Sequence, residues 1–314
     1  MKKKLLILLI GILCLALAGC GAEAGESENG DKTPEPAPSG ETPEQAAGDL
    51  YLIRSVTVYS VDFETGEWNE DHRVEYTYEE GYPLTKSTIY PFMDEPDTVQ
   101  FEYTFEGGLP SLLHYTGSEG TSEVTREYRN GRPWEENSVV AGVETRRVLY
   151  QYGGEDGYYF TVLLSDMRSS SEELETGYAM EEIDSIAVTT ENGLLRKTVN
   201  SGLYANWNED EEKEWMRFNG TYTVLYDGDG FAYETSAVFR AGPEGGKDLF
   251  ELTKENGLVT EAVRLAQDPG GEPYPMERYV FEYTDIPTDA VRYASMINSH
   301  IMGEASNFYR YFWY

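Results

Sequence analysis

Side chains that could carry catalysis are present in this chain, but their spacing completes no reactive pattern. The three histidines, His72, His114 and His300, lie far apart, and none has the second histidine three or four positions away that a zinc site on a helix needs. The sequence contains no Gly-x-Ser-x-Gly segment to present a serine nucleophile. Because the chain holds 57 Asp and Glu residues, carboxylate pairs at glycosidase spacing arise by chance and indicate nothing. We therefore predict that the protein is not an enzyme and uses no metal or cofactor.

Two glycine-containing segments approach a ligand-binding motif and then depart from it. The segment 242–248 contains a Gly-Lys pair like that of a phosphate-binding loop. However, Ala241 stands where the motif has its first glycine, and Asp248 stands where it has the Ser or Thr hydroxyl that binds magnesium. The segment Asp227-Gly228-Asp229-Gly230 begins like a calcium loop, yet Phe231 stands where the next oxygen ligand belongs. We expect a plain loop at the first segment and a hairpin turn at the second.

Aromatic side chains give the only positive indication of a binding function. Aromatic residues make up 13% of the chain, and Trp134, Trp207 and Trp215 each lie beside a predicted turn or charged loop. Exposed there, they would offer flat surfaces for stacking on sugars or for contacting a partner protein. The alternative is that the aromatics only stabilise a sheet through cross-strand pairs, at about 0.2–1 kcal/mol each. The acidic run 208–212 is expected to be a solvated loop, with a weak divalent-cation site as the alternative.

The N-terminus has the organisation of a secretion signal. Three lysines at positions 2–4 precede an apolar run of 14 residues from Leu5 to Ala18, which is short for a bilayer span and typical of a signal-peptide core. The run ends in Leu17-Ala18-Gly19-Cys20, which resembles the lipobox of bacterial lipoproteins. The resemblance implies that residues 1–19 are removed, that Cys20 carries the lipid, and that the protein is held at the cell membrane on its extracytoplasmic side. Cys14 would be lost with the signal peptide.

Composition separates a tether from a folded domain and restricts the partners. Residues 21–48 contain no aromatic residue and no Val, Ile, Leu or Met, so we expect residues 20–48 to be a disordered, lipid-bearing tether. The formal net charge is −33, and removal of the three N-terminal lysines would take it to −36. So negative a chain is unsuited to nucleic-acid phosphates or anionic lipid surfaces. Beyond the membrane anchor, we expect a cationic protein, a neutral glycan or a divalent cation as partner.

The remaining residues, 49–314, must supply the elements that position any site, and their pattern is that of β-strands. Apolar and polar residues alternate, as in 74–78, 101–105 and 222–226. Turn-forming pairs follow these runs. They are Glu80-Gly81, Gly107-Gly108, Asn130-Gly131, Gly153-Gly154, Asn192-Gly193, Asp227-Gly228 and Asn256-Gly257. We predict an all-β antiparallel meander of degenerate hairpin repeats. It would form a strongly twisted or curled sheet, either an open barrel-like sheet or two packed sheets.

The hairpin pattern resembles the YD/Rhs type of β-hairpin repeat. The matching stretches are Tyr76-Thr77-Tyr78 to Leu84-Thr85-Lys86, Phe101-Glu102-Tyr103 to Leu109, Asn130-Gly131-Arg132-Pro133, Tyr226-Asp227-Gly228 and Asn256-Gly257-Leu258-Val259. Only Tyr226-Asp227 keeps the Tyr-Asp pair of that family. Near the C-terminus the pattern changes, and Tyr293, Ile297 and Ile301 fall on one helical stripe. We expect one helix near residues 288–302, covering a face or an edge of the sheet.

The functional hypothesis drawn from the sequence is a lipid-anchored surface protein that binds a protein or a glycan without catalysis. Its basis is the lipobox together with the broad aromatic surfaces that such a sheet would offer. Two alternatives stay open at this point: a hydrolase whose carboxylates are dispersed along the chain, and a purely structural component of the envelope.

Overall fold

A computed structural model describes the folded part of the chain. The described residues are 49–118, 120–140, 143–153, 158–165, 181–206, 216–239 and 245–302. The predicted signal peptide, Cys20 and the tether lie outside these residues, as do Trp207, Trp215 and the acidic run between them. Among the described residues, no helix has the length and apolar character needed to cross a membrane.

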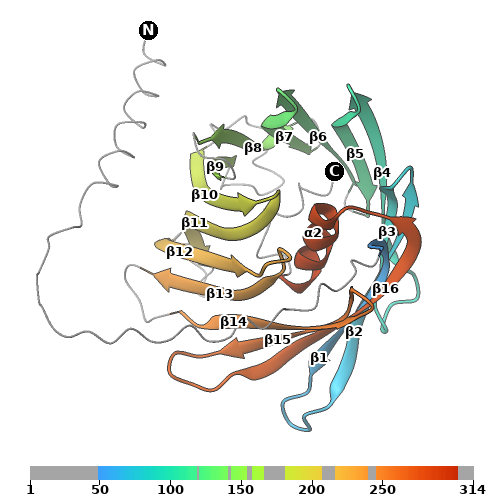
Figure 1. Cartoon of the computed structure of the whole chain (residues 1–314), viewed down its shortest axis with the longest axis vertical. Coiled ribbons are helices and arrows are strands. Elements are labelled where there is room, and N and C mark those ends of the chain that lie inside the picture. Colours follow the sequence, from blue (N-terminus) through green and yellow to red (C-terminus); the bar gives the residue numbers. More distant parts are fainter. Residues whose placement is uncertain are drawn as a thin grey trace, which may run out of the picture. The chain divides into compact units, whose positions relative to one another are not determined.

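The body of the chain is an antiparallel meander, as predicted, in which each strand pairs with the next (Figure 1). The strands are β1 (Tyr51–Val61), β2 (Trp68–Glu79), β3 (Tyr82–Ile89), β4 (Asp97–Glu106), β5 (Leu109–Gly117), β6 (Gly120–Arg129), β7 (Arg132–Val140), β8 (Val143–Tyr152), β9 (Tyr158–Ser165), β10 (Glu181–Glu191), β11 (Leu194–Asn206), β12 (Met216–Tyr226), β13 (Ala232–Phe239), β14 (Lys247–Glu255), β15 (Leu258–Gln267) and β16 (Tyr274–Pro287). A single helix follows them within the described residues, α2 (Ala290–Ile301), inside the range expected from the sequence.

The first and last strands also pair, so the sheet closes into a barrel. Val56 of β1 is in register with Val74 of β2 on one side and with Phe281 of β16 on the other. Of the two arrangements left open by the sequence, two packed sheets is therefore wrong, and the barrel-like sheet is closed rather than open. Alternation along the strands places buried side chains on the inner face and exposes their neighbours on the outer face. In β4, Phe101 is buried while its neighbours Gln100 and Glu102 are exposed.

Five hairpins share one turn geometry, which confirms five of the seven glycine-based turn predictions. The pair Gly153-Gly154 lies partly outside the described residues, and the turn at Asp227-Gly228 is longer, with positive φ at Gly230 instead. In the five hairpins, both central residues have positive φ, as the two-residue turn of type I′ requires, and in Asn130-Gly131 these angles are 55° and 74°. The other four turns lie at 80–81, 107–108, 192–193 and 256–257. Each turn is followed by a β-bulge. The register shifts by one residue after the second residue pair beyond the turn. Identical turns with identical bulges show that the hairpins are structural repeats.

Tyrosine hydroxyls join neighbouring hairpins at these bulges. Tyr128 of β6 donates to the carbonyl of Pro110 in β5, at 2.9 Å, and Tyr152 of β8 donates to Pro133 in β7, at 2.8 Å. Both accepting carbonyls stand beside the residue where the register shifts. A bulge removes a carbonyl from the regular ladder, and a buried carbonyl without a donor is costly. The tyrosines thus satisfy a requirement that the repeat itself creates.

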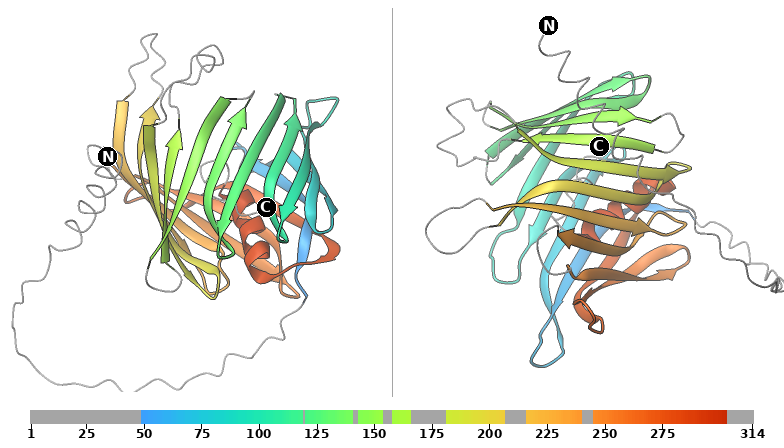
Figure 2. Two further views of the ribbon diagram at one scale, coloured as in Figure 1. Left: turned by 90° about the horizontal axis from the view of Figure 1, so that it is seen from above. Right: turned by 90° about the vertical axis from the view of Figure 1, so that its left-hand side faces the viewer.

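Helix α2 is enclosed by the strands at the end of the barrel that carries the short turns (Figures 1 and 2). Asp289 caps its N-terminus by accepting from Arg292 N at 2.9 Å. The six residues 293–298 are all buried, which shows that the helix has protein on every side there. We name this end, with the turns before β3, β5, β7, β11, β13 and β15, the plugged end. The sequence-based expectation that the helix covers a face or an edge is corrected: it fills the mouth of a barrel.

The main hydrophobic core is built around that helix. Helix residues Met296, Ile297 and Ile301 are fully buried with apolar residues of β1 and of β12–β16. Two smaller apolar clusters lie elsewhere on the inner face, one between β8 and β10 and one across β4, β5 and β6. The packed core is therefore concentrated at the plugged end, and the connections at the opposite end contribute little to it.

Candidate binding surface

Of the predicted binding residues, Trp134 is the one that the structure describes, and it has a structural contact. It is the bulge residue of β7, and the Arg129 guanidinium lies 3.8 Å from the centre of its ring, in a cation–π arrangement. One face of the indole is thereby occupied. Cys20, Trp207 and Trp215 lie outside the described residues, so their roles stay predictions.

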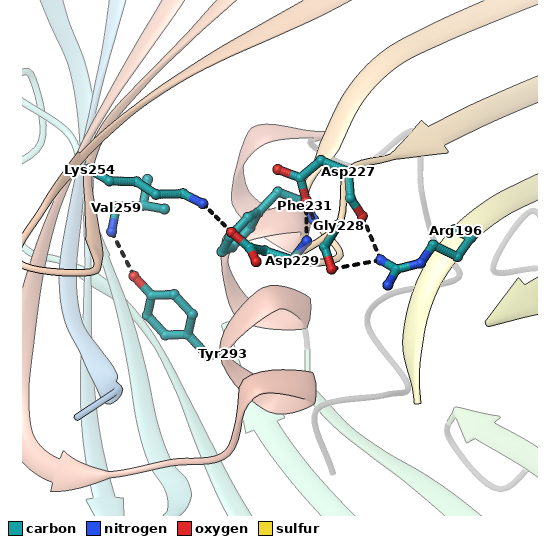
Figure 3. Close-up of polar contacts among 8 residues, drawn as sticks. All are labelled: Arg196, Asp227, Gly228, Asp229, Phe231, Lys254, Val259 and Tyr293. Carbon is teal, nitrogen blue, oxygen red and sulfur yellow. Dashed lines mark hydrogen bonds and ion pairs between the residues drawn. The ribbon is translucent and has the colours of Figure 1, made fainter. Parts of the chain in front are cut away.

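The Asp227 turn, predicted to be a hairpin turn rather than a calcium loop, is held by protein cations (Figure 3). The Asp227 carboxylate accepts from the backbone N–H groups of Asp229 and Phe231, both at 2.9 Å. Arg196 donates to the carbonyls of Asp227 and Gly228, at 2.6 and 2.9 Å. Lys254 lies 2.6 Å from the Asp229 carboxylate. One carboxylate oxygen of Asp227 and one of Asp229, together with the carbonyls of Asp227 and Gly228, are thus bound to N–H groups or cations of the chain.

Carboxylates on the inner face are paired with arginines. Arg126 and Glu136 stand opposite each other on β6 and β7, both buried, and the guanidinium Nε lies 2.9 Å from the carboxylate. Arg264 bridges Glu277 and Asp248, at 3.0 and 3.2 Å. Removing one partner of such a buried pair leaves an uncompensated charge, which is strongly destabilising. These groups therefore hold strands together.

Tyrosines and one histidine complete the polar interior. Tyr279 donates to Glu277 at 2.5 Å, and burial, reinforced by the Glu277 charge, raises the pKa of Tyr279. The His300 ring contacts the rings of Tyr76 and Phe281, and its Nε2 lies 3.2 Å from the Tyr76 hydroxyl. Burial, with smaller contributions from the charges of nearby cationic groups, lowers the pKa of His300 to about 3. His300 is therefore neutral at physiological pH and serves packing.

Exposed apolar side chains gather on three loops at the end of the barrel opposite α2. Phe63 in the β1–β2 loop is 70% exposed and Phe92 in the β3–β4 loop is 80% exposed, with Met93 beside it. Tyr274 ends the β15–β16 loop, and its ring centre lies 6.4 Å from that of Phe63. The pairing of β16 with β1, and of β2 with β3, makes these loops neighbours. We name Phe63, Phe92, Met93 and Tyr274 the aromatic rim.

Hydrogen bonds within each loop order the aromatic rim. Asp62 closes the β1–β2 loop through two hydrogen bonds. Its carboxylate accepts from Glu64 N at 2.8 Å, and its carbonyl accepts from Gly66 N at 2.7 Å. In the β15–β16 loop, Gly271 donates to Asp268 at 2.9 Å. The β3–β4 loop is closed by one longer bond, from Met93 N to the Tyr90 carbonyl. Side chains on ordered loops lose less conformational entropy on binding.

The same loops carry negative charge only. The connections 62–67, 90–96 and 268–273 contain seven Asp and Glu residues and no Lys or Arg. At the plugged end, by contrast, cations stand beside the turns. They include Arg129, Arg132, Arg196, Lys254 and Arg292. The exposed aromatics thus lie on three loops that carry carboxylates and contain no Lys or Arg of their own.

Sequence reasoning missed the aromatic rim because it searched for tryptophans and for alternation. The available signal was one or two large apolar residues inside a short acidic loop, as in Asp62-Phe63-Glu64 and Phe92-Met93-Asp94. A group of large apolar side chains that stays exposed to solvent is kept at a cost in solubility. That cost points to a contact outside the fold.

No protein-family model matches the sequence. No curated protein matches it either. Among solved structures, the chain is similar to a porin-like protein from Bacteroides vulgatus, with 10% sequence identity and a TM-score of 0.42. That match covers 76% of this chain and 100% of the other.

Proposed function

We propose that this protein is a lipid-anchored, extracytoplasmic binding module that recognises a partner in the envelope through the aromatic rim, without catalysis. The observation that carries the proposal is the exposure of Phe63 and Phe92 on neighbouring, internally ordered loops. Interaction surfaces on proteins are enriched in such aromatic side chains. The lipobox at Cys20 supports the location, and the polar outer face of the strands suits a body surrounded by water.

Hydrolysis has less support. A general acid or base needs a carboxyl group that can exchange protons with a substrate. On the inner face, Asp248, Glu277 and Glu136 all accept hydrogen bonds from arginine. Among the described residues, no group of three His, Cys, Asp or Glu side chains is placed to hold a metal ion.

The test uses the full chain, purified in detergent and labelled, and measures its binding to isolated envelope fractions. The Phe63→Ser/Phe92→Ser variant should lose saturable binding, because it removes the two most exposed anchors while leaving the core intact. The matched control is Tyr233→Ser/Val238→Ser, which removes exposed apolar side chains from β13 instead. Equal binding by all three proteins would refute the role of the aromatic rim. Intact mass should in parallel show lipid on Cys20 and none after Cys20→Ala.

A further inference from the structure

We propose that the aromatic rim binds a cationic amphipathic protein segment, one that carries Lys or Arg beside exposed apolar side chains. This inference rests on the proposed function and names the chemistry of its partner. Two properties of the same three loops carry it: apolar side chains turned to solvent, and carboxylates in segments that contain no Lys or Arg.

The apolar half of the argument is geometric. Phe63 and Tyr274 meet edge to face, with an angle of 70° between their rings, so together they offer one continuous apolar surface from two loops. On the next loop, the Phe92 ring stands 5.4 Å from that of Tyr90. A segment lying across these loops would bury several apolar side chains at once, which a single exposed residue would not allow.

The charged half of the argument is complementarity. Exposed Glu64, Glu95 and Glu272 stand one on each loop, within three residues of a rim side chain. A neutral sugar gains no charge attraction from this arrangement, and an anionic lipid or polymer is repelled by it. A partner with positive charge next to apolar groups gains from both properties, through apolar burial and through charge attraction. Such complementarity raises the rate of encounter and excludes partners of the wrong charge.

The probe is a synthetic peptide of about 18 residues, or about five helical turns, with Lys on one face and Leu on the other. Two matched peptides replace every Lys by Glu, or every Leu by Ser. Binding to the full chain in zwitterionic detergent is followed by fluorescence anisotropy. The Lys-Leu peptide should bind, and its affinity should fall several-fold when NaCl rises from about 50 to about 300 mM. The other two peptides should bind at least tenfold more weakly.

Variants locate the binding. Phe63→Ser/Phe92→Ser should raise the Kd for the Lys-Leu peptide at least tenfold, and Glu64→Gln/Glu95→Gln/Glu272→Gln should raise the Kd and flatten its salt dependence. Tyr233→Ser/Val238→Ser should leave both unchanged, and circular dichroism checks that all variants fold. The inference is overturned if the Lys-Leu peptide fails to bind, if the Glu-Leu peptide binds equally well, or if the rim variants bind like the unaltered chain. The proposed function is judged separately, by the envelope-binding assay. It would still stand if the peptide results were negative but the unaltered chain bound envelope fractions and Phe63→Ser/Phe92→Ser did not.

Discussion

Asn298 connects the helix to the barrel wall, and its replacement tests whether α2 is a structural plug. The side chain is fully buried. Its Nδ2 donates to the carbonyl of Gly230 and its Oδ1 accepts from Ala232 N, both at 2.8 Å, so it spans the turn before β13. Asn298→Leu keeps the branching at Cγ and the number of non-hydrogen atoms, and it removes both bonds. It leaves one backbone N–H and one carbonyl buried without partners, at about 1–3 kcal/mol each. We expect a loss of about 2–5 kcal/mol in the free energy of unfolding.

The assay is urea denaturation followed by far-ultraviolet circular dichroism and by tryptophan fluorescence. The control is Ser299→Ala on the same helix, since Ser299 is half-buried and donates only to Met296 within the helix. It should cost less than about 1 kcal/mol. A loss below about 0.5 kcal/mol for Asn298→Leu, or equal losses for both variants, would refute the view that the helix is anchored through this side chain.

Asn298→Asp adds a pH-dependent arm to the same experiment. The new carboxylate would still accept from Ala232 N but would face the Gly230 carbonyl, an acceptor, so burial and repulsion would raise its pKa. A carboxyl whose pKa is raised on folding binds a proton more readily in the folded state. The folded state of this variant should therefore gain stability relative to Asn298→Leu as the pH falls from 7 towards 5. An unchanged difference over that range would contradict the assigned bonds.

Three further predictions follow from the interior and from the Asp227 turn. The lowered pKa of His300 means that the unfolded chain takes up a proton below about pH 6.5 and the folded chain does not. The unaltered chain should thus lose about 1–2 kcal/mol of folding stability relative to His300→Gln when the pH falls from 7 to 5. His114→Gln is the control. Asp227→Ala should cost about 1–2 kcal/mol in urea denaturation, whether or not millimolar calcium is present, since the carboxylate serves the turn. Glu136→Gln should cost about 3 kcal/mol by stranding the buried Arg126 charge, whereas Arg126→Met/Glu136→Leu should recover most of that loss.

The repeat could be predicted from the sequence because its determinants are local. A two-residue turn in which both φ angles are positive favours Gly, Asn or Asp. Pairs such as Asn130-Gly131 and Asn256-Gly257 therefore predict hairpins from the local sequence alone. The alternation around Phe101 is local as well, since successive side chains on a strand point to opposite faces. It therefore predicted which residues of this strand share a buried face. The helix was visible through the period of Tyr293, Ile297 and Ile301.

Closure of the barrel and formation of the aromatic rim could not be predicted in this way. Closure depends on the accumulated twist and register of every strand, and the pairing of Val56 with Phe281 joins positions that are more than two hundred residues apart. The rim brings Phe63 and Tyr274 together through that same pairing. The hydrogen bonds from tyrosine hydroxyls at the bulges could not be predicted from the sequence either, because they depend on a register shift in the neighbouring hairpin.

The different character of the two ends of the barrel follows from how the interior is filled. A closed sheet of this many strands is too wide for strand side chains to fill alone, so an additional element is needed to exclude water from the core. Helix α2 supplies it at the plugged end, where Asn298 and Tyr293 bind backbone groups of the turn before β13 and of β15. The turns at that end are held against the helix, since Arg292 donates to the Gly81 carbonyl and Asn298 to the Gly230 carbonyl. The opposite end has no such constraint, so its loops are free to carry exposed side chains such as Phe63 and Phe92. Under the proposed function, stability and recognition depend on opposite ends of the barrel, so substitutions in the aromatic rim should alter binding and leave folding intact.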